Sequence, residues 1–307
     1  MKYSVIVISF ENFSTTTDLL LKSLLSSKSK YEAEIILFDN GSSSESLRQI
    51  KLLKETDERL KVICNQKNLG FAGGNNQAFK HSKGEIIIFL NSDTITTFPV
   101  LDRLVEEMGK YSLEILGPLS NAVSGVQRIK IFANDKNLIL KEGEFINNSE
   151  LSIEPFETDC LSFFCICMNR KIYEKLHGLD EEYKMGYYED TDFCFRARKS
   201  GIRLHCTENV FVYHKGEGSF SNVSMESTIV ENRKRFKKLH RGLKSRKVRD
   251  ENLDRLKYYK KQLQENQTAE HWHFLIRRRS ELFKDYKPKG IIRALVYKVK
   301  IINLKNI

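Results

Sequence analysis

Short apolar strands that alternate with stretches of helical periodicity constrain the fold of this chain more than any other feature. Through residues 1–118 this alternation predicts βα units and a mostly parallel sheet, one half of a doubly wound α/β fold. Pro99 suits the first turn of a helix, where a missing N–H costs nothing. The predicted strands are Lys2–Phe10, Glu34–Asp39, Leu60–Asn65, Glu85–Leu90 and Glu114–Gly117, and the predicted helices are Thr16–Ser26, Ser44–Glu55, Asn75–Ser82 and Val100–Lys110.

The pattern weakens after this half and then returns. Residues 119–157 carry Asn, Gly and Lys between short apolar pieces, which predicts loops with one or two edge strands. Regular structure resumes as a buried strand, a short helix, a longer helix and further strand material. The corresponding segments are Thr158–Met168, Arg170–His177, Glu189–Ser200 and Arg203–His214.

Cysteine spacing and hydropathy indicate the redox state of the thiols and the expected cellular location. The six cysteines form no C-x-x-C pair and have no zinc-type spacing, so reduced, mostly buried thiols are expected. Cys165 and Cys167 alternate inside an apolar run, which fits a buried strand better than a metal or redox site. No apolar stretch reaches about 18 residues and no separate signal peptide is evident, so we expect a cytoplasmic protein.

Positive charge is concentrated in the last quarter of the chain. Residues 231–307 hold 24 Lys and Arg against 8 Asp and Glu, whereas the residues before them are slightly acidic. We expect a domain over residues 1–221 and a basic, mainly helical extension over residues 222–307. Within it, basic and apolar residues alternate over Ile291–Ile302. This segment could bind an anionic membrane surface or pack on its own domain.

Polar residues that directly follow strands are the candidate ligand contacts, because ligands of such sheets bind outside the carboxyl ends of the strands. Asp39 can accept a hydrogen bond from a ribose hydroxyl or a uracil-type N–H, although Asn40 and Gly41 also suit a simple turn. Residues 68–76 form a glycine-rich loop whose backbone N–H groups can approach a diphosphate. This loop has neither the G-x-G-x-x-G pattern nor a P-loop.

Three further groups carry potential chemistry. Asp93, after an apolar strand, suits a Mg²⁺ or Mn²⁺ shared with phosphate oxygens, or the N-cap of a helix. His214 follows another strand and could ligate the same ion. Glu189, Asp190 and Asp192 open a helix among aromatic residues, which fits capping but also a carboxylate of raised proton affinity that acts as a general base.

These segments, in this order, resemble the family two glycosyltransferases, especially bacterial rhamnosyltransferase-like enzymes of surface-polysaccharide synthesis. The matching segments span about 215 residues and are residues 5–10, 39–42, 68–75, 91–93 and 186–196, together with His214. The resemblance implies a Rossmann-like, nucleotide-sugar-binding α/β fold of type A with a mostly parallel central sheet. It further implies an inverting, metal-dependent transfer from a UDP- or dTDP-sugar to a hydroxyl of a glycan or lipid-linked glycan.

The resemblance also assigns roles to residues. Asp93 and His214 would hold Mn²⁺ or Mg²⁺, although the sequence here is Asn91-Ser92-Asp93 where many relatives have D-x-D. Asp190 would be the base, Glu189 would orient the acceptor, and Asp192 would cap the helix. The expected donor contacts are Ser9, Phe10, Asp39, Asn68, Gly70, Asn75, Asn91 and Ser92.

Two alternatives belong to other functional classes. The reduced Asn91-Ser92-Asp93 motif would fit a protein that binds nucleotide sugars without transferring them. Arg233–Arg249 holds ten basic residues and would fit nucleic-acid binding. Few aromatic residues interleave them and no nucleic-acid motif is present, so no nucleic-acid partner is expected. A solvated helix face, or attraction to anionic lipids at the inner face of the cell membrane, explains them better.

Overall fold

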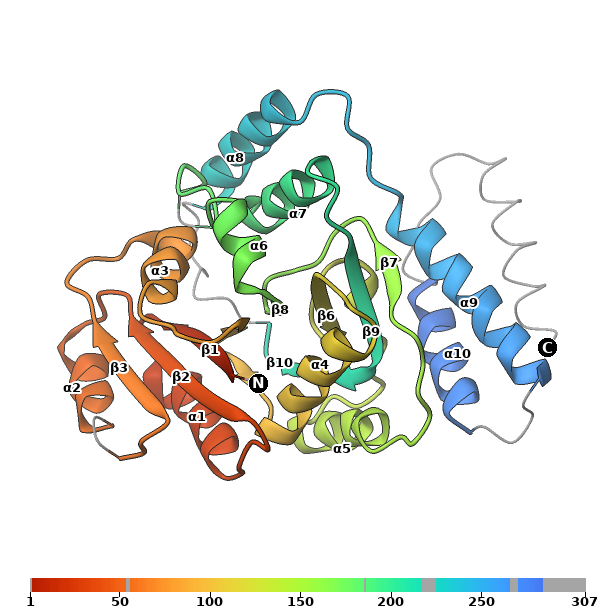
Figure 1. Ribbon diagram of the computed structural model, residues 1–307, viewed down its shortest axis with the longest axis horizontal. Coiled ribbons are helices and arrows are strands. Elements are labelled where there is room, and N and C mark those ends of the chain that lie inside the picture. The colour runs from red at the N-terminus through yellow and green to blue at the C-terminus, as the bar shows by residue number, and fades with distance from the viewer. Residues whose placement is uncertain (1, 54–55, 185, 217–224, 266–269, 284–307) are drawn as a thin grey trace.

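The computed structural model describes residues 2–53, 56–184, 186–216, 225–265 and 270–283. These residues form a central sheet with helices on both faces and three further helices toward the C-terminal end (Figure 1). The predicted α/β architecture with a mostly parallel sheet is therefore confirmed.

The sheet has eight strands in the order β3-β2-β1-β4-β8-β6-β9-β7. Strands β3, β2, β1 and β4 are mutually parallel, β8 runs antiparallel between β4 and β6, and β7 is antiparallel to β9 at the edge. A separate two-stranded sheet pairs β5 with β10. The strands are β1 Lys2–Ser9, β2 Glu32–Asp39, β3 Leu60–Cys64, β4 Ile86–Asn91, β5 Thr94–Ile95, β6 Ile115–Leu119, β7 Phe156–Thr158, β8 Cys165–Asn169, β9 Leu204–Phe211 and β10 Tyr213–His214.

Alternation along the strands divides the core into two layers. Val5 and Val7 of β1 belong to the apolar cluster on one face, whereas Ile6 belongs to the cluster on the other. Strand side chains point alternately to opposite faces, so a strand that is apolar at every position must be covered on both. Helices α1, α2 and α4 contribute to the first cluster, and α3, α6, α7, α9 and α10 contribute to the second.

The helices of the first 216 residues connect these strands. The 3-10 turns η1 and η2 cover Phe13–Thr15 and Gly125–Gln127. The helices are α1 Thr17–Leu25, α2 Ser44–Leu52, α3 Gly70–Phe79, α4 Phe98–Lys110, α5 Lys136–Asn147, α6 Arg170–Lys175 and α7 Glu189–Lys199.

Two sequence-based predictions are wrong in the middle of the chain. The single strand predicted for Thr158–Met168 is two strands, β7 and β8, because β7 pairs at the sheet edge while β8 pairs between β4 and β6. The loop region 119–157 contains helix α5, which Asp135 caps by accepting hydrogen bonds from two backbone N–H groups. Gly143 of α5 allows the helix to pack closely on β9, because a Cβ at this position would lie 2.2 Å from the ring of Phe211.

Three basic helices follow residue 224, as the sequence predicted: α8 Met225–Leu239, α9 Val248–Glu265 and α10 Glu270–Leu282. Helices α9 and α10 pack on the sheet through a buried charge cluster, in which Glu208 of β9 pairs with Arg255 and Arg279 and accepts from Tyr259. No helix among the described residues is long and apolar enough to cross a membrane. The predicted segment Ile291–Ile302 lies outside the described residues.

Candidate functional site

The carboxyl ends of β1, β2 and β4 meet at one level of the sheet. Ser9 pairs with Asp39 across β1 and β2, and Ile8 pairs with Asn91 across β1 and β4. Two adjoining cavities of about 100 and 380 Å³ open there. Both are lined by Phe71, Asn91 and Asp93, so they form one cleft with a small and a large compartment.

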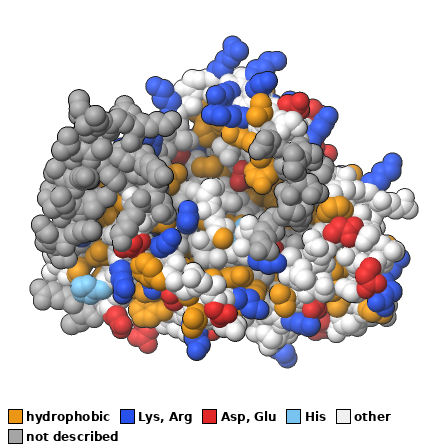
Figure 2. Space-filling view, turned by 180° about the vertical axis from the view of Figure 1, so that it is seen from behind, with side chains coloured by type: hydrophobic (Ala, Val, Ile, Leu, Met, Phe, Trp, Pro, Cys, Tyr) orange, Lys and Arg blue, Asp and Glu red, His pale blue; other side chains and the backbone are white. Residues whose placement is uncertain are grey.

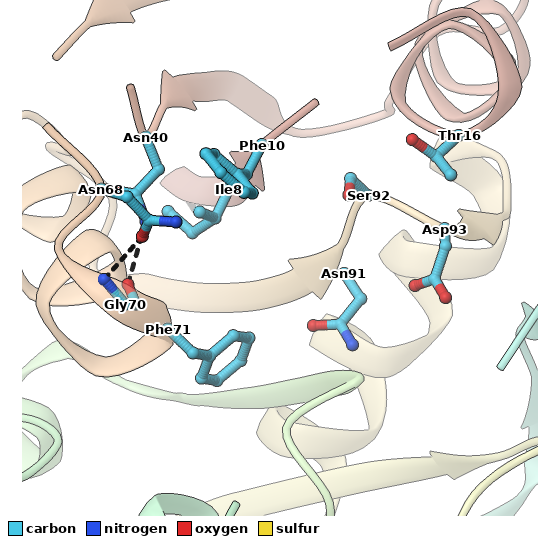
Figure 3. Close-up of a pocket in the computed structure, with 10 residues that line it drawn as sticks. All are labelled: Ile8, Phe10, Thr16, Asn40, Asn68, Gly70, Phe71, Asn91, Ser92 and Asp93. Atoms are coloured by element: carbon cyan, nitrogen blue, oxygen red, sulfur yellow. Dashed lines mark hydrogen bonds between the residues drawn. The ribbon is translucent and has the colours of Figure 1, made fainter. Parts of the chain in front are cut away.

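The small compartment is built around the side-chain amide of Asn40, which the sequence analysis interpreted only as a turn residue (Figure 3). Asn40 donates to Asn68 Oδ1 at 3.1 Å and to the Gly70 carbonyl at 3.0 Å, and it accepts from the Leu69 N–H at 3.0 Å. Asn40 thereby fixes the turn that begins α3. Figure 3 shows this turn on one side of the compartment and Asp93 on the other. The lining residues are Ile8, Phe10, Thr16, Asn40, Asn68, Gly70, Phe71, Asn91, Ser92 and Asp93.

The predicted glycine-rich loop is largely helix. Gly70 has a φ of +71° and lines the cleft at the start of α3, but Gly73 and Gly74 are buried inside this helix. A Cβ at Gly74 would lie 3.1 Å from the Asn40 amide and 3.3 Å from Ile8. Gly74 therefore allows α3 to approach β1 and the end of β2 closely, whereas a Cβ at Gly73 would meet Leu69 and Glu181. The start of α3, at Gly70 and Phe71, is the part of the motif that lines the cleft.

Three of the predicted donor contacts lie behind the cleft wall. Ser9 is fully buried, with its hydroxyl 2.9 Å from that of Thr17, and Asn75 donates to the Phe71 carbonyl within α3. Asp39 is also fully buried, and its Oδ1 accepts from the Ser42 N–H at 3.3 Å. Burial raises the pKa of Asp39. Among the described residues nothing hydrogen-bonds its Oδ2, so this buried oxygen is an unsatisfied acceptor.

Asp93 and His214, the two residues that the sequence analysis assigned to an ion, face one another between the two compartments. His214 Nε2 lies 3.1 Å from Asp93 Oδ1, and Nδ1 lies 2.6 Å from the Ala122 carbonyl. Burial opposes a charged imidazole, but Asp93 and the Ala122 carbonyl outweigh it and raise the pKa of His214. Asp93 Oδ2 is buried with no hydrogen-bond partner among the described residues.

The residues that orient His214 were missed by the sequence analysis. Asn121 donates to the His214 carbonyl at 2.8 Å and accepts from its N–H at 2.9 Å, and Phe164 stacks on the imidazole with ring centroids 5.4 Å apart. Asn121 and Ala122 belong to the region that was interpreted as pattern-poor loop. Because their contacts depend on tertiary position, periodicity offers no signal for them.

Glu189 and Asp190 begin helix α7 and line the large compartment. Glu189 is 6% exposed, and its Oε2 has no hydrogen-bond partner among the described residues. Burial, together with the charge of Asp190, raises the pKa of Glu189 to about 8. Asp190 Oδ1 accepts from the N–H and hydroxyl of Thr191 at 2.6 and 3.1 Å, while burial raises the pKa of this carboxyl as well.

The prediction that Asp192 caps α7 is wrong. Its Oδ2 accepts from Arg196 at 2.6 Å, and its Oδ1 lies 2.7 Å from Nε2 of His240, the residue that directly follows helix α8. Tyr188 occupies the N-cap position in a left-handed conformation, and no side chain in the described part of the chain caps the helix. Asp192 therefore ties α7 to α8.

Protein side chains alone do not form a metal site among the described residues. The described part of the chain holds no group of three or more His, Cys, Asp or Glu side chains that could bind an ion together. Asp93 and His214 offer one carboxylate and one imidazole, so an ion here would need further oxygens from a ligand.

Two known proteins are similar to this chain in sequence over most of their length. The low-salt glycan biosynthesis hexosyltransferase of Haloferax volcanii is 25% identical over 233 residues, 74% of this chain and 71% of that protein. The GalNAc(5)-diNAcBac-PP-undecaprenol β-1,3-glucosyltransferase of Campylobacter jejuni is 23% identical, covering 77% of this chain and 78% of that protein.

Solved structures of low sequence identity share the fold. GalNAc-T7 with UDP, GalNAc and Mn²⁺ superposes with a TM-score of 0.59 at 18% identity, over 78% of this chain and 48% of that one. The mannosyltransferase of Pyrobaculum calidifontis with GDP-Man and Mn²⁺ gives 0.56 at 14% identity, over 80% and 65%. The predicted type A glycosyltransferase fold is confirmed.

A family model matches more than half of this chain. The model described as glycosyl transferase family 2 matches residues 4–176, which include β1, β2, β4 and the strand ends that form the small compartment, but end before Glu189. This match spans more than half of the chain. The chain therefore belongs to glycosyl transferase family 2.

Proposed function

We propose that this cleft transfers a sugar, with inversion, from a UDP- or dTDP-sugar to a hydroxyl of a glycan or lipid-linked glycan in surface-polysaccharide synthesis. One observation carries the proposal: Asp93 and His214 lie between a small compartment at the strand ends and a large one lined by Glu189 and Asp190. The small compartment suits the nucleotide, the boundary suits the diphosphate, and the large compartment suits the acceptor. The relatives' names, which include glycan-building hexosyltransferases, support this substrate class.

The donor assignment rests on unsatisfied polar groups and backbone donors. Asp39 Oδ2 can accept from the base or ribose once the small compartment widens around them. The Gly70 N–H donates to Asn68 Oδ1 at 2.8 Å, so the N–H groups that follow it in the first turn of α3 are the ones that we propose for the anionic diphosphate. We propose the remaining donor contacts at Phe10, Asn91 and Ser92, which line the same compartment.

Asp93 and His214 fit a divalent cation shared with the donor diphosphate. The Ala122 carbonyl fixes the proton of neutral His214 on Nδ1, so the Nε2 lone pair points toward Asp93, whose Oδ2 has no partner among the described residues. A carboxylate together with an imidazole favours Mn²⁺ over Mg²⁺, which prefers oxygen ligands. When bound, the ion would neutralise charge on the departing diphosphate.

Asp190 is the proposed general base. A raised pKa makes a carboxylate a stronger base, and Thr191 holds its Oδ1 in place. Asp190 accepts the proton of the acceptor hydroxyl as that oxygen bonds to the anomeric carbon and the bond from carbon to diphosphate oxygen breaks on the opposite side. Glu189, with a pKa of about 8, is mostly protonated at neutral pH and can donate a hydrogen bond that orients the acceptor.

We further propose that helix α8 and the residues just after it, as far as Leu243, meet an anionic membrane that carries a lipid-linked acceptor. Figure 2 shows Lys and Arg side chains gathered over this end of the molecule. Val230, Leu239 and Leu243 are exposed beside them, which suits shallow insertion next to anionic headgroups. We expect the wild-type protein to float with anionic but not with zwitterionic vesicles, and a variant with Glu in place of the cations named below to lose this flotation. Equal flotation of the wild type and the charge-reversed variant contradicts the proposal. The exposed cations are Arg233, Lys234, Lys237, Lys238 and Arg241.

A transfer assay tests the proposed function. Labelled UDP- and dTDP-sugars are incubated with Mn²⁺, glycan and lipid-diphosphate acceptors and the wild-type, Asp190→Asn or Glu182→Gln protein. Glu182 is exposed and lies outside the cleft lining, so its variant is a matched control. Transfer with an inverted product linkage that only Asp190→Asn loses supports the proposal. Donor binding without transfer to any acceptor would favour a nucleotide-sugar-binding protein instead.

A further inference from the structure

A backbone turn with an unusual conformation precedes the two acidic residues. Gly186, Tyr187 and Tyr188 have φ angles of +116°, +70° and +78° in succession. This region is unfavourable for side chains that carry a Cβ, and two consecutive tyrosines in it require support from surrounding structure. Such strain, directly before Glu189, indicates that the directions of the Tyr187 and Tyr188 side chains serve a function that outweighs the conformational cost of the turn.

The support comes from helix α8. The Asn232 side chain is 4% exposed, and its amide donates to the Gly186 carbonyl at 2.9 Å and to the Tyr187 carbonyl at 3.1 Å. Tyr188 packs against Phe236 of the same helix, with ring centroids 5.5 Å apart. A single buried amide thus satisfies two carbonyls of the strained turn, and the neighbouring ring pair fixes its far end.

The consequence of the turn is the position of Tyr187. While Tyr188 is packed against α8, Tyr187 is 47% exposed and lines the large compartment together with Asp190. An exposed aromatic ring at the wall of a polar cleft offers an apolar face with a hydroxyl at its edge. A pyranose ring has the matching chemistry, since its C–H groups form apolar faces and its hydroxyls lie around the rim.

We propose that Tyr187 is the platform on which the acceptor's terminal sugar ring stacks, and that Asn232 is a positioning residue that holds this platform beside Asp190. This inference rests on the proposed function and deepens it, because it assigns the acceptor subsite to a turn that α8 supports. Asn232 lies beyond residues 4–176, the part matched by the family model. Acceptor recognition is thereby coupled to a helix outside that match.

The test separates acceptor binding from donor binding. Initial rates are measured with the donor sugar that wild type uses and a panel of alkyl-diphosphate-linked GlcNAc, GalNAc, glucose and rhamnose. Tyr187→Ala is expected to raise the acceptor KM about tenfold and to leave the donor KM and the slow transfer to water unchanged. Tyr187→Phe and Tyr187→Trp, which keep a ring, are expected to stay within about threefold of wild type.

Asn232→Asp tests the positioning role without a change of shape. It removes the N–H donors and is expected to raise the acceptor KM as Tyr187→Ala does, while the double variant is no worse than Tyr187→Ala alone. Asn137→Asp, at an exposed position of α5, adds the same charge and should behave like wild type. A Tyr187→Ala protein with an unchanged acceptor KM overturns the inference, as does an Asn232→Asp protein that loses donor and acceptor binding equally. Absence of wild-type transfer to every acceptor would instead overturn the proposed function.

Discussion

Replacing Glu189 with Gln should stabilise the folded protein above neutral pH. The pKa of Glu189 is raised from 4.5 to about 8 by burial and by the charge of Asp190. Between these two values the folded state keeps a proton that the unfolded state has lost, so the free energy of unfolding falls as pH rises through this window. At about 1.4 kcal/mol per pKa unit, the full shift corresponds to an upper limit of about 5 kcal/mol. Water entering the cleft on ionisation reduces this, and we expect about 2–3 kcal/mol at pH 8.5.

Urea unfolding at pH 5.5, 7.0 and 8.5 measures this effect. Gln has nearly the shape of protonated Glu and stays neutral, so the two proteins should be similar at pH 5.5 and diverge as pH rises. The exposed Glu182→Gln substitution controls for loss of one negative charge. A stability difference between wild type and Glu189→Gln that does not change with pH, or a less stable variant at pH 8.5, would refute the reasoning.

Three further substitutions address catalysis and packing. Asp190→Asn should lower the transfer rate about 10²–10⁴-fold while donor affinity, measured by titration calorimetry, stays within about twofold; an active variant would remove Asp190 as the base. Arg279→Ala leaves the fully buried Glu208 with one partner fewer and should cost about 3 kcal/mol in urea unfolding, whereas an unchanged midpoint would contradict the role of this pair. Gly143→Ala should destabilise the protein by about 1–3 kcal/mol in the same assay, because its Cβ would meet Phe211. Helix propensity alone predicts stabilisation, and that result would show that α5 can move away from Phe211 at little cost.

Strand ends were predictable from the sequence because a local pattern determines them. Asp39 and Asp93 follow apolar strands directly, and parallel strands bring their carboxyl ends together without further information. The His214 partnership with Asp93 followed from the order of motifs in a known family, and the structure gives the pair a distance of 3.1 Å. Predictions from local pattern and from family resemblance both work without knowledge of tertiary contacts.

The features that escaped prediction depend on tertiary contacts. The glycines of α3 looked like a phosphate loop, but Gly73 and Gly74 lie inside a helix that packs closely on the sheet. Asn40 and Asn232 are buried amides that support turns far away in sequence, and no periodicity distinguishes them from surface asparagines. Asp192 looked like a helix cap because caps and ion pairs use the same residue types at a helix start.

The most direct test of the account is a thermal-shift titration of wild type and Asp93→Ala with UDP, dTDP, GDP, CMP and common UDP- and dTDP-sugars, each with and without Mn²⁺. A ligand that binds only the folded state raises its stability with the logarithm of ligand concentration over Kd. The account predicts a Mn²⁺-dependent shift of several degrees with a UDP or dTDP compound and its loss in Asp93→Ala. No shift with any nucleotide, or an equal shift in both proteins, would contradict the donor site described here.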